Sequence, residues 1–361
     1  MIKICCIILN LSYILFNIYL LIKKKNILIL KKRLIFKNCD NFTMTYVNKT
    51  YKDISNYLNI KYSPKMVKND SSKNTSLKKK IILYSVDLYN PKRHRDWLLE
   101  RIDNKFLLIF DPDNPDYLIF NVFGTKHLNP KYNNSIKIAV FTENKIPDLN
   151  EVDYAMGFSH INYLDRFMRC PIYYQVYANY KYIRDKLLTN PNRKKFCAAV
   201  ISNSKKFTSF RLKFIKELNK YKKVDMGGKY NNNVGFYVEN KVIFLSSYKF
   251  SIAMENSEGE GYTSEKIFQS FISGTIPIYY GNYLIDEFIN PKSFILIRNE
   301  KDIKSKIEYI KKIDNDDNLY KKILKENVII NYNIKKSIDE QKQFFWNIFE
   351  QEKSKAYRRY N

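Results

Sequence analysis

Short apolar runs alternate with polar stretches along most of this chain. Beginning near Lys80, four such runs follow one another: "IILYSV", "FLLIF", "YLIFNVF" and "IKIAVF". Each is rich in β-branched and aromatic residues, and continuous apolar runs of this length are typical of parallel strands buried on both faces. Because polar or helix-like stretches separate them, we predict a first α/β domain over residues 77–190.

A second series of the same kind follows the break at "TNPNRKK" (189–195). It contains the strand-like runs "FCAAVIS", "KFSIAM" and "TIPIYY", and a helix is predicted from about Ser264. Two more helices are indicated by apolar residues at helix spacing: Leu212, Ile215 and Leu218 in one, and Ile303, Ile307, Ile310 and Ile313 in the other. We predict a second α/β domain over 191–345 and a basic tail over 346–361. Together the two series predict an α/β protein with two Rossmann-like domains facing one cleft.

The segment before these domains has a different character. The run from Ile4 to Ile22 is apolar and close to the minimum length for a membrane span, and no small-residue cleavage site follows it. We expect a retained, single-pass signal-anchor within residues 1–25 and a polar stem over 26–76. Six basic residues follow the anchor and favour the cytoplasm, whereas a Golgi-type lumenal domain, expected if the source is eukaryotic, needs the opposite orientation. The pattern leaves the orientation open.

Composition narrows the range of partners. The chain has 361 residues and a formal net charge of +27, which first suggests nucleic acid or an anionic surface. However, the basic residues are 51 Lys and only 12 Arg, and no nucleic-acid-binding motif accompanies them. We therefore expect no nucleic-acid partner, although a site for an anionic nucleotide remains compatible. Two of the five cysteines, Cys5 and Cys6, lie in the N-terminal apolar run, and the other three are widely spaced. With only three histidines in the chain, this pattern indicates neither a disulfide framework nor a zinc site.

The stretch "ENSEGEGYTSEK" (255–266) concentrates the candidate chemistry between a predicted strand and a predicted helix. Ligands of open α/β sheets bind at the carboxyl ends of strands. Thr263 or Ser264 can cap the helix, whose N-terminus favours an anion, and Lys266 adds a positive charge in the first turn. Hydroxyl groups of a sugar or ribose could be held by the polar residues Glu255, Asn256 and Glu265. This pattern is typical of a site for a nucleotide diphosphate joined to a sugar.

Three stretches resemble the family-ten glycosyltransferases, the α-1,3/α-1,4-fucosyltransferases, and especially their bacterial Lewis-type members. "ENSEGEGYTSEKIFQSFISGTIPIYYGN", followed by "INPKSFILI", is similar to the family signature. Residues 141–174 resemble its acceptor-side block, and residues 200–235 resemble the start of its donor domain. The resemblance implies a GT-B fold in which the first domain takes the acceptor and the second takes GDP-fucose. It also implies an inverting displacement assisted by a carboxylate base.

The resemblance also implies roles for individual residues. Glu143, in "FTENKIP", matches the position of the catalytic carboxylate. The positions matching donor-binding residues are Arg211, Asn256, Tyr262, Glu265 and Lys266, with Glu255 and Ser264 as supporting residues. Ser264 stands where the family usually has Thr, and it keeps the hydroxyl. The C-terminal cysteine pairs of vertebrate members and the heptad-repeat tail of bacterial members are absent from this sequence.

The function implied is transfer of L-fucose from GDP-fucose to an acceptor glycan, with α-1,3 linkage to the N-acetylglucosamine of an N-acetyllactosamine-like chain. We expect no metal ligands and no required cofactor, with a divalent cation at most stimulatory. Two alternatives stay open. Asp111 and Asp113, in "FLLIFDPD", could hold a metal in a metal-dependent glycosyltransferase, although "DPDNPD" is also a good turn sequence. The chain could instead be a non-catalytic sugar- or nucleotide-binding module on the same fold.

Overall fold

The first series of apolar runs forms a six-stranded parallel sheet. A computed structural model describes residues 78–361 apart from 89–90, 103–104, 189–194, 203–208 and 360–361. All of these residues lie in one compact unit, Thr43–Asn361. The sheet has the order β2-β1-β3-β4-β5-β6, and every neighbouring pair is parallel. Its strands are β1 (Lys80–Val86), β2 (Leu107–Phe110), β3 (Tyr117–Phe120), β4 (Ile136–Val140), β5 (Tyr154–Gly157) and β6 (Phe167–Arg169).

The second series forms a five-stranded parallel sheet of order β11-β10-β9-β7-β8. Its strands are β7 (Lys195–Ala199), β8 (Val224–Met226), β9 (Tyr248–Ile252), β10 (Ile276–Tyr279) and β11 (Ile295–Leu296). The α-helices described are α3 (Pro91–Ile102), α4 (Ile172–Leu188), α5 (Ser209–Leu218), α6 (Lys241–Leu245), α7 (Glu265–Ile272), α8 (Asp302–Asn315), α9 (Asp317–Lys325), α10 (Ile334–Glu350) and α11 (Lys353–Ala356). Short 3-10 helices are η2 (Lys126–Leu128), η3 (Pro130–Tyr132), η4 (Leu164–Arg166), η6 (Ile285–Glu287) and η7 (Pro291–Ser293).

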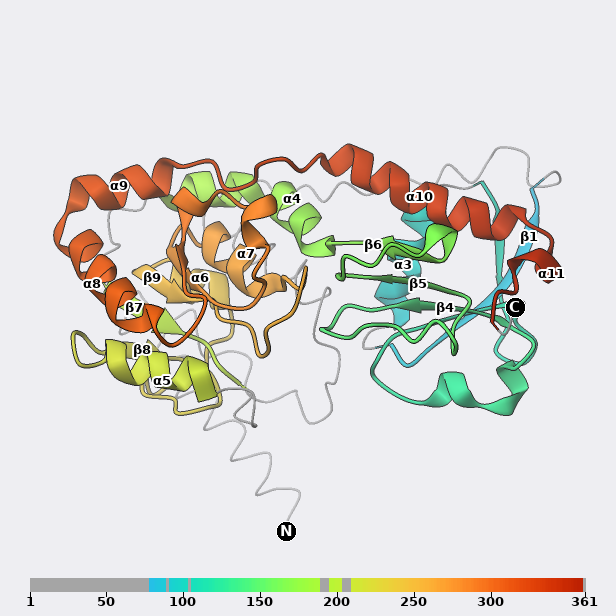
Figure 1. Ribbon diagram of the computed structural model, residues 1–361, viewed down its shortest axis with the longest axis horizontal. Coiled ribbons are helices and arrows are strands. Elements are labelled where there is room, and N and C mark those ends of the chain that lie inside the picture. Colours follow the sequence, from blue (N-terminus) through green and yellow to red (C-terminus); the bar gives the residue numbers. More distant parts are fainter. Residues whose placement is uncertain (1–77, 89–90, 103–104, 189–194, 203–208, 360–361) are drawn as a thin grey trace, which may run out of the picture. The chain divides into compact units, whose positions relative to one another are not determined.

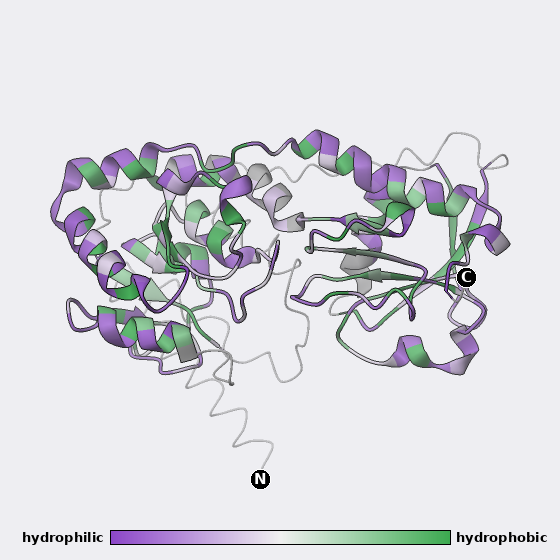
Figure 2. Ribbon diagram, viewed as in Figure 1, coloured by the Kyte–Doolittle hydropathy of each residue, from purple (hydrophilic) through white to green (hydrophobic). Residues whose placement is uncertain are grey.

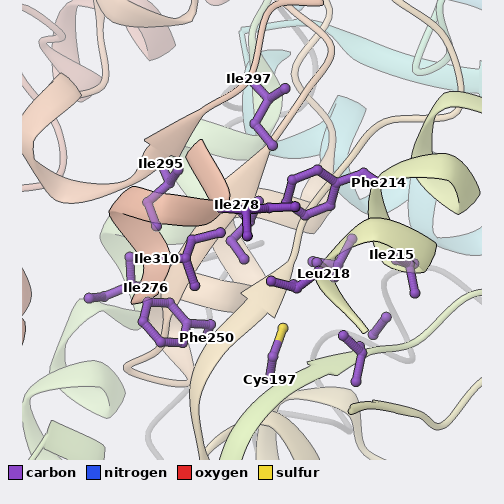
Figure 3. Packing of buried hydrophobic residues seen from close by; sticks show 14 of the residues in the cluster. Cys197, Phe214, Ile215, Leu218, Phe250, Ile276, Ile278, Ile295, Ile297 and Ile310 are labelled. Atoms are coloured by element: carbon purple, nitrogen blue, oxygen red, sulfur yellow. The ribbon is translucent and has the colours of Figure 1, made fainter. Parts of the chain in front are cut away.

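Helices cover both faces of the second sheet, which explains why most residues of its strands are apolar. On one face, side chains of α5, α8 and α9 pack against β7, β9 and β10. Figure 3 shows Phe214 and Leu218 of α5 and Ile310 of α8 gathered around Phe250 and Ile278 of the sheet. The opposite face packs against α4, α6 and α7. The helix spacing of the apolar residues therefore matches the face that each helix buries.

The first sheet is covered on one face by α3 and α10. Trp97 and Leu98 of α3 share a buried cluster with Phe345 and Phe349 of α10. Helix α10 lies beside α3 in Figure 1, although it follows the second sheet in the chain. Its alternating hydrophobic and hydrophilic colouring in Figure 2 matches a helix with one buried face. The C-terminal helices α10 and α11 therefore return to complete the first domain.

Both sheets have the same strand order as flavodoxin-like folds, 2-1-3-4-5, with one more strand in the first sheet. In such sheets the second strand is added on one side of the first strand, and the later strands are added on its other side. A crevice forms at the carboxyl ends of the first and third strands, where this reversal occurs. The positions concerned follow β1 and β3 in the first sheet, and β7 and β9 in the second. Residues Asp87 and Asn121 occupy the first position, and Glu255 lies just beyond β9.

The predicted anchor and stem, residues 1–76, lie outside the described residues. Within the part of the chain that the structure describes, no helix combines the length and apolar character needed to span a membrane.

Candidate active site

Glu255 is the central group of the strand–loop–helix corner predicted from the sequence. It follows β9, is 1% exposed, and its backbone N–H donates to the carbonyl of Tyr280 beyond β10. Its carboxylate accepts hydrogen bonds from the backbone N–H of Ser264 at 2.7 Å and from the Ser264 hydroxyl at 2.6 Å. Gly281, at φ +150°, leaves the room for it, because a Cβ there would lie 2.5 Å from the Cγ of Glu255. The carboxylate therefore fixes the loop to the start of α7.

The N-terminus of α7 carries the expected cap and cation. Of the two residues that the sequence allowed as the cap, Ser264 is the N-cap, and Thr263 instead accepts a hydrogen bond from Asn282. The Lys266 Nζ donates to Glu255 at 3.0 Å and to the Ser264 hydroxyl at 2.9 Å. It also lies 3.5 Å from Glu265. Burial alone would lower the pKa of Lys266, but the two carboxylates outweigh it and hold that pKa above its ordinary value. Lys266 is therefore a fixed ammonium beside a helix N-terminus.

Arg211 joins the same corner from helix α5. Its guanidinium is buried, and Nη1 donates to the Met254 carbonyl and to the Asn256 side-chain oxygen, both at 3.3 Å. Burial lowers the pKa of Arg211, and the charge of Glu255 opposes that effect. The structure thus brings Arg211, Asn256 and Lys266 together around Glu255, although 45 positions of sequence separate the first two.

Glu143 comes to this corner from the first domain. It lies three residues beyond β4, and its carboxylate accepts a hydrogen bond from the Tyr262 hydroxyl at 3.3 Å. Tyr262 is 3% exposed and packs edge-on against Phe158 of the first domain, with ring centroids 5.2 Å apart. Gly261, at φ +75°, permits the approach, because a Cβ there would lie 2.2 Å from the Phe158 carbonyl oxygen. The contact between Glu143 and Tyr262 joins the predicted base to the predicted donor corner.

The environment of Glu143 suits a general base. Its side chain remains accessible to solvent, yet partial desolvation by the surrounding protein raises its pKa. The charge of Lys266 opposes this shift, the charge of Glu265 adds to it, and the Tyr262 hydrogen bond again opposes it. In its ionised form, a carboxylate whose pKa lies above the ordinary value is a stronger base than an ordinary glutamate.

Lys241 is a site residue that the sequence analysis did not select. It begins α6, whose N-cap is Asn240, and its charge interacts with Glu265, Lys266, Glu255 and Arg211. Burial is the main reason that the pKa of Lys241 falls to about 8. No local motif marks it, because it precedes the "ENSEGEGYTSEK" stretch by a whole strand. Because the chain is rich in lysine, the sequence does not distinguish Lys241 from the others. Its role becomes apparent only because α6 packs beside α7.

Asp111 and Asp113, the alternative metal-binding pair, lie in a turn that the Asp111 side chain stabilises. The Asp111 carboxylate accepts the backbone N–H of Asp113 at 2.8 Å and that of Asn114 at 3.2 Å, as in a turn closed by an aspartate side chain. Asp113 lies 3.5 Å from Lys131. Among the described residues, no group of three or more His, Cys, Asp or Glu side chains has the arrangement of a metal site. The geometry therefore agrees with the turn interpretation of "DPDNPD".

Two family models match the chain in the order of its domains. The model "Alpha-(1,3)-fucosyltransferase FucT N-terminal domain" matches residues 83–177. The model "Glycosyltransferase family 10 (fucosyltransferase) C-term" matches residues 190–357, which include every candidate donor-binding residue. The chain belongs to glycosyltransferase family 10.

Individual relatives agree with this assignment. The chain is similar to the α-(1,3)-fucosyltransferase FucT of Helicobacter pylori, 33% identical over 254 residues, which are 60% of this chain and 52% of the relative. It is also similar to a putative fucosyltransferase of Acanthamoeba polyphaga mimivirus, 36% identical over 152 residues, which are 38% of this chain and 24% of the relative. The chain thus spans about half the length of the first relative and less of the second.

Solved structures extend the likeness to the fold of both domains. A crystal structure of an α1,3-fucosyltransferase matches with a TM-score of 0.67 and 25% identity, covering 78% of this chain and 93% of that one. A structure of α1,3-fucosyltransferase with GDP-fucose matches with a TM-score of 0.65 and 25% identity, covering 83% of this family-10 chain and 97% of the other. The fold, with its two parallel sheets, therefore matches that of solved α1,3-fucosyltransferases.

Proposed function

We propose that this family-10 chain is an inverting fucosyltransferase that moves L-fucose from GDP-fucose to a hydroxyl of an acceptor glycan. The observation that carries the proposal is the contact between Glu143 and Tyr262. It sets a solvent-accessible carboxylate of raised pKa against a corner that contains Lys266, Arg211 and the N-terminus of α7. The similarity to α-1,3-fucosyltransferases supports GDP-fucose as the donor.

The reaction proposed is a single displacement at the anomeric carbon of fucose. Glu143 takes the proton of the acceptor hydroxyl as its oxygen forms a bond to that carbon, and the carbon–oxygen bond to GDP breaks. The electron pair leaves with the diphosphate. Lys266, Arg211 and the positive end of the α7 helix dipole stabilise the charge that develops there. Because this set of cations is built into the protein, we propose that a divalent metal is at most stimulatory.

The acceptor proposed is an N-acetyllactosamine-like glycan, fucosylated by α-1,3 linkage on N-acetylglucosamine. We also propose that the apolar segment within residues 1–25 anchors the chain in a membrane, with the catalytic domain in a Golgi-type lumen if the source is eukaryotic. The apolar run supports the anchor, and the basic residues after it leave the orientation open. Alkaline carbonate extraction tests the anchor, since an anchored chain stays in the membrane pellet and release into the supernatant contradicts it.

The experiment that tests the function measures release of GDP from GDP-fucose by the full chain, with and without N-acetyllactosamine and with and without EDTA. We expect release that depends on the acceptor, persists in EDTA and is lost in Glu143→Gln. The matched control is Glu308→Gln, on the exposed surface of α8, which should keep wild-type activity.

Each other outcome has a definite meaning. Release abolished by EDTA would contradict the metal-independent mechanism and redirect attention to Asp111 and Asp113. Unchanged release in Glu143→Gln would exclude that residue as the base. If the chain binds GDP but releases none from GDP-fucose with any acceptor, the result would support the non-catalytic binding module.

A further inference from the structure

A hydrogen-bonded aspartate–histidine pair lies at the carboxyl end of the first sheet, away from the donor corner. Asp87 directly follows β1 and has the unusual φ of +54°. Its carboxylate accepts the backbone N–H groups of Lys126 and His127 at 3.0 and 2.9 Å, and it contacts the Nδ1 of His127 at 2.6 Å. Gly124 leaves room for it, because a Cβ there would lie 2.3 Å from the carboxylate. The pair is thus held by several independent contacts.

These contacts define which nitrogen of His127 faces a ligand. Burial would raise the pKa of Asp87, but the hydrogen bonds from His127 and the backbone outweigh it and hold that pKa below its ordinary value. An ionised carboxylate only accepts, so Nδ1 carries the proton that faces Asp87, and Nε2 is the ring nitrogen left for a ligand. Among the described residues Nε2 has no hydrogen-bond partner. The ring is held flat against Phe120, with centroids 4.1 Å apart and an interplanar angle of 7°.

A pocket of about 190 Å³ opens beside this pair. Phe120, Phe141 and Ile146 form apolar walls, and Ile146 at its edge is 66% exposed. The polar lining carries both signs of charge, including Lys145 and Asp148, in addition to the imidazole. Apolar walls combined with hydrogen-bonding groups of both signs suit a neutral, hydroxyl-rich ring better than an anion or a cation.

The pocket is continuous with the loop that carries Glu143. Phe141 and Lys145 both line it, and they flank Glu143 by two residues on either side. The backbone N–H of Lys145 donates to the Glu143 carbonyl at 2.8 Å, so the loop turns sharply there. The pocket also lies where the strand order of the first sheet reverses, between β1 and β3, which is the usual binding crevice of this kind of sheet.

We propose that this pocket binds the neutral sugar that neighbours the fucosylated sugar in the acceptor, and that His127 is its specificity-determining residue. The assignment rests on the proposed function, because it takes the acceptor to be a glycan placed against Glu143. A sugar hydroxyl donates to Nε2 of His127, and the carbon–hydrogen face of the ring packs on Ile146 and Phe141. Asp87 is a positioning residue that fixes the tautomer and the orientation of His127.

The test measures equilibrium binding by the full chain in the presence of GDP, with N-acetyllactosamine and with N-acetylglucosamine alone as probes. We expect His127→Ala to raise the Kd for the disaccharide about tenfold, as for loss of one well-placed hydrogen bond and its packing. The Kd for N-acetylglucosamine and the Kd for GDP should not change. Because His127 stacks on a core aromatic residue, thermal denaturation must show that this variant remains folded.

A second variant keeps the test independent of folding. Ile146→Trp fills the mouth of the pocket from an exposed position and should raise the disaccharide Kd by a similar factor. Leu164→Trp, at an 89% exposed position of the same domain that does not line the pocket, is the matched control and should bind like wild type.

Three results would overturn the assignment. These are a wild-type chain that does not bind the disaccharide, an unchanged disaccharide Kd in Ile146→Trp, or an equal loss of N-acetylglucosamine binding. Turnover of GDP-fucose is measured separately. If the disaccharide binds through this pocket but no fucose is transferred, the proposed function fails while the pocket assignment stands.

Discussion

Glu143 is subject to opposing effects that can be separated by single substitutions. Desolvation raises its pKa first, and Lys266 opposes that shift; Glu265 then raises the pKa and the Tyr262 hydrogen bond lowers it. The base must be ionised to accept the proton of the acceptor hydroxyl. Activity should therefore be lost as the pH falls through a value above the ordinary glutamate pKa.

Tyr262→Phe should move this acidic limb to higher pH. Removal of the hydroxyl takes away a hydrogen bond that favours the ionised carboxylate, so the pKa of Glu143 rises further. The measurement is kcat as a function of pH, with Tyr309→Phe on exposed α8 as the control. An acidic limb at the same pH in wild type and Tyr262→Phe would mean that Tyr262 does not influence the base.

Lys241 should contribute an alkaline limb to the binding of GDP. Its pKa of about 8 means that it is charged below that pH and becomes neutral as the pH rises through it. Affinity for the diphosphate should therefore fall above about pH 8. Lys241→Met should lose about 1 kcal/mol of binding at neutral pH, about fivefold in Kd, and should lack the alkaline limb. Lys241→Arg stays charged, so it should bind GDP well and should also lack the alkaline limb. An unchanged Kd for GDP in Lys241→Met would exclude a contact between Lys241 and the diphosphate.

At the scale of elements, the junction between β9 and α7 depends on one buried carboxylate. Glu255 holds the N-cap Ser264 and neutralises Lys266. Glu255→Gln removes the nearer of the two carboxylates beside the Lys266 ammonium. It should lower the free energy of unfolding by about 2 kcal/mol, as for a charged hydrogen bond. Urea denaturation measures the loss, and Glu308→Gln on exposed α8 is the matched control. Equal stability of Glu255→Gln and wild type would show that the neutral amide replaces the carboxylate fully.

The pattern of apolar runs predicted the longer elements well. The runs "IILYSV", "YLIFNVF" and "IKIAVF" correspond to β1, β3 and β4, and the isoleucines at helix spacing correspond to α8. The sequence analysis did not identify β5, β6, β8 and β11, which have two to four residues each. Such short segments lack a period of their own, and their pairing in the sheet makes them strands.

At the scale of the whole molecule, the chain crosses back from the second sheet to the first. Phe345 of α10 is fully buried among residues of α3 and β1–β5. Phe345→Ala should lower the free energy of unfolding by about 3–5 kcal/mol because it leaves a cavity in that core. Gln343→Ala, on the exposed side of the same helix, should have little effect. Denaturant titration of both variants decides the point, and similar stabilities would mean that α10 contributes little to the first domain.

The α/β class, the two series of strands, and the corner at 255–266 with its cap and lysine were all predictable from the sequence, because these features are local. Hydrophobic period, capping chemistry and a long motif need only neighbouring residues. The donor-binding and catalytic roles came from the family resemblance and remain predictions until the variants are measured.

The contacts between distant residues were not predictable from the sequence and are seen only in the folded chain. The fold joined Glu143 to Tyr262 across 119 positions of sequence, placed Lys241 beside α7, and paired Asp87 with His127 at the edge of a pocket. It also put α10 on the first sheet. Parallel sheets bring the carboxyl ends of all their strands to one edge, so residues far apart in the chain meet there. Their proximity depends on strand order, which no local pattern of hydrophobic and polar residues contains.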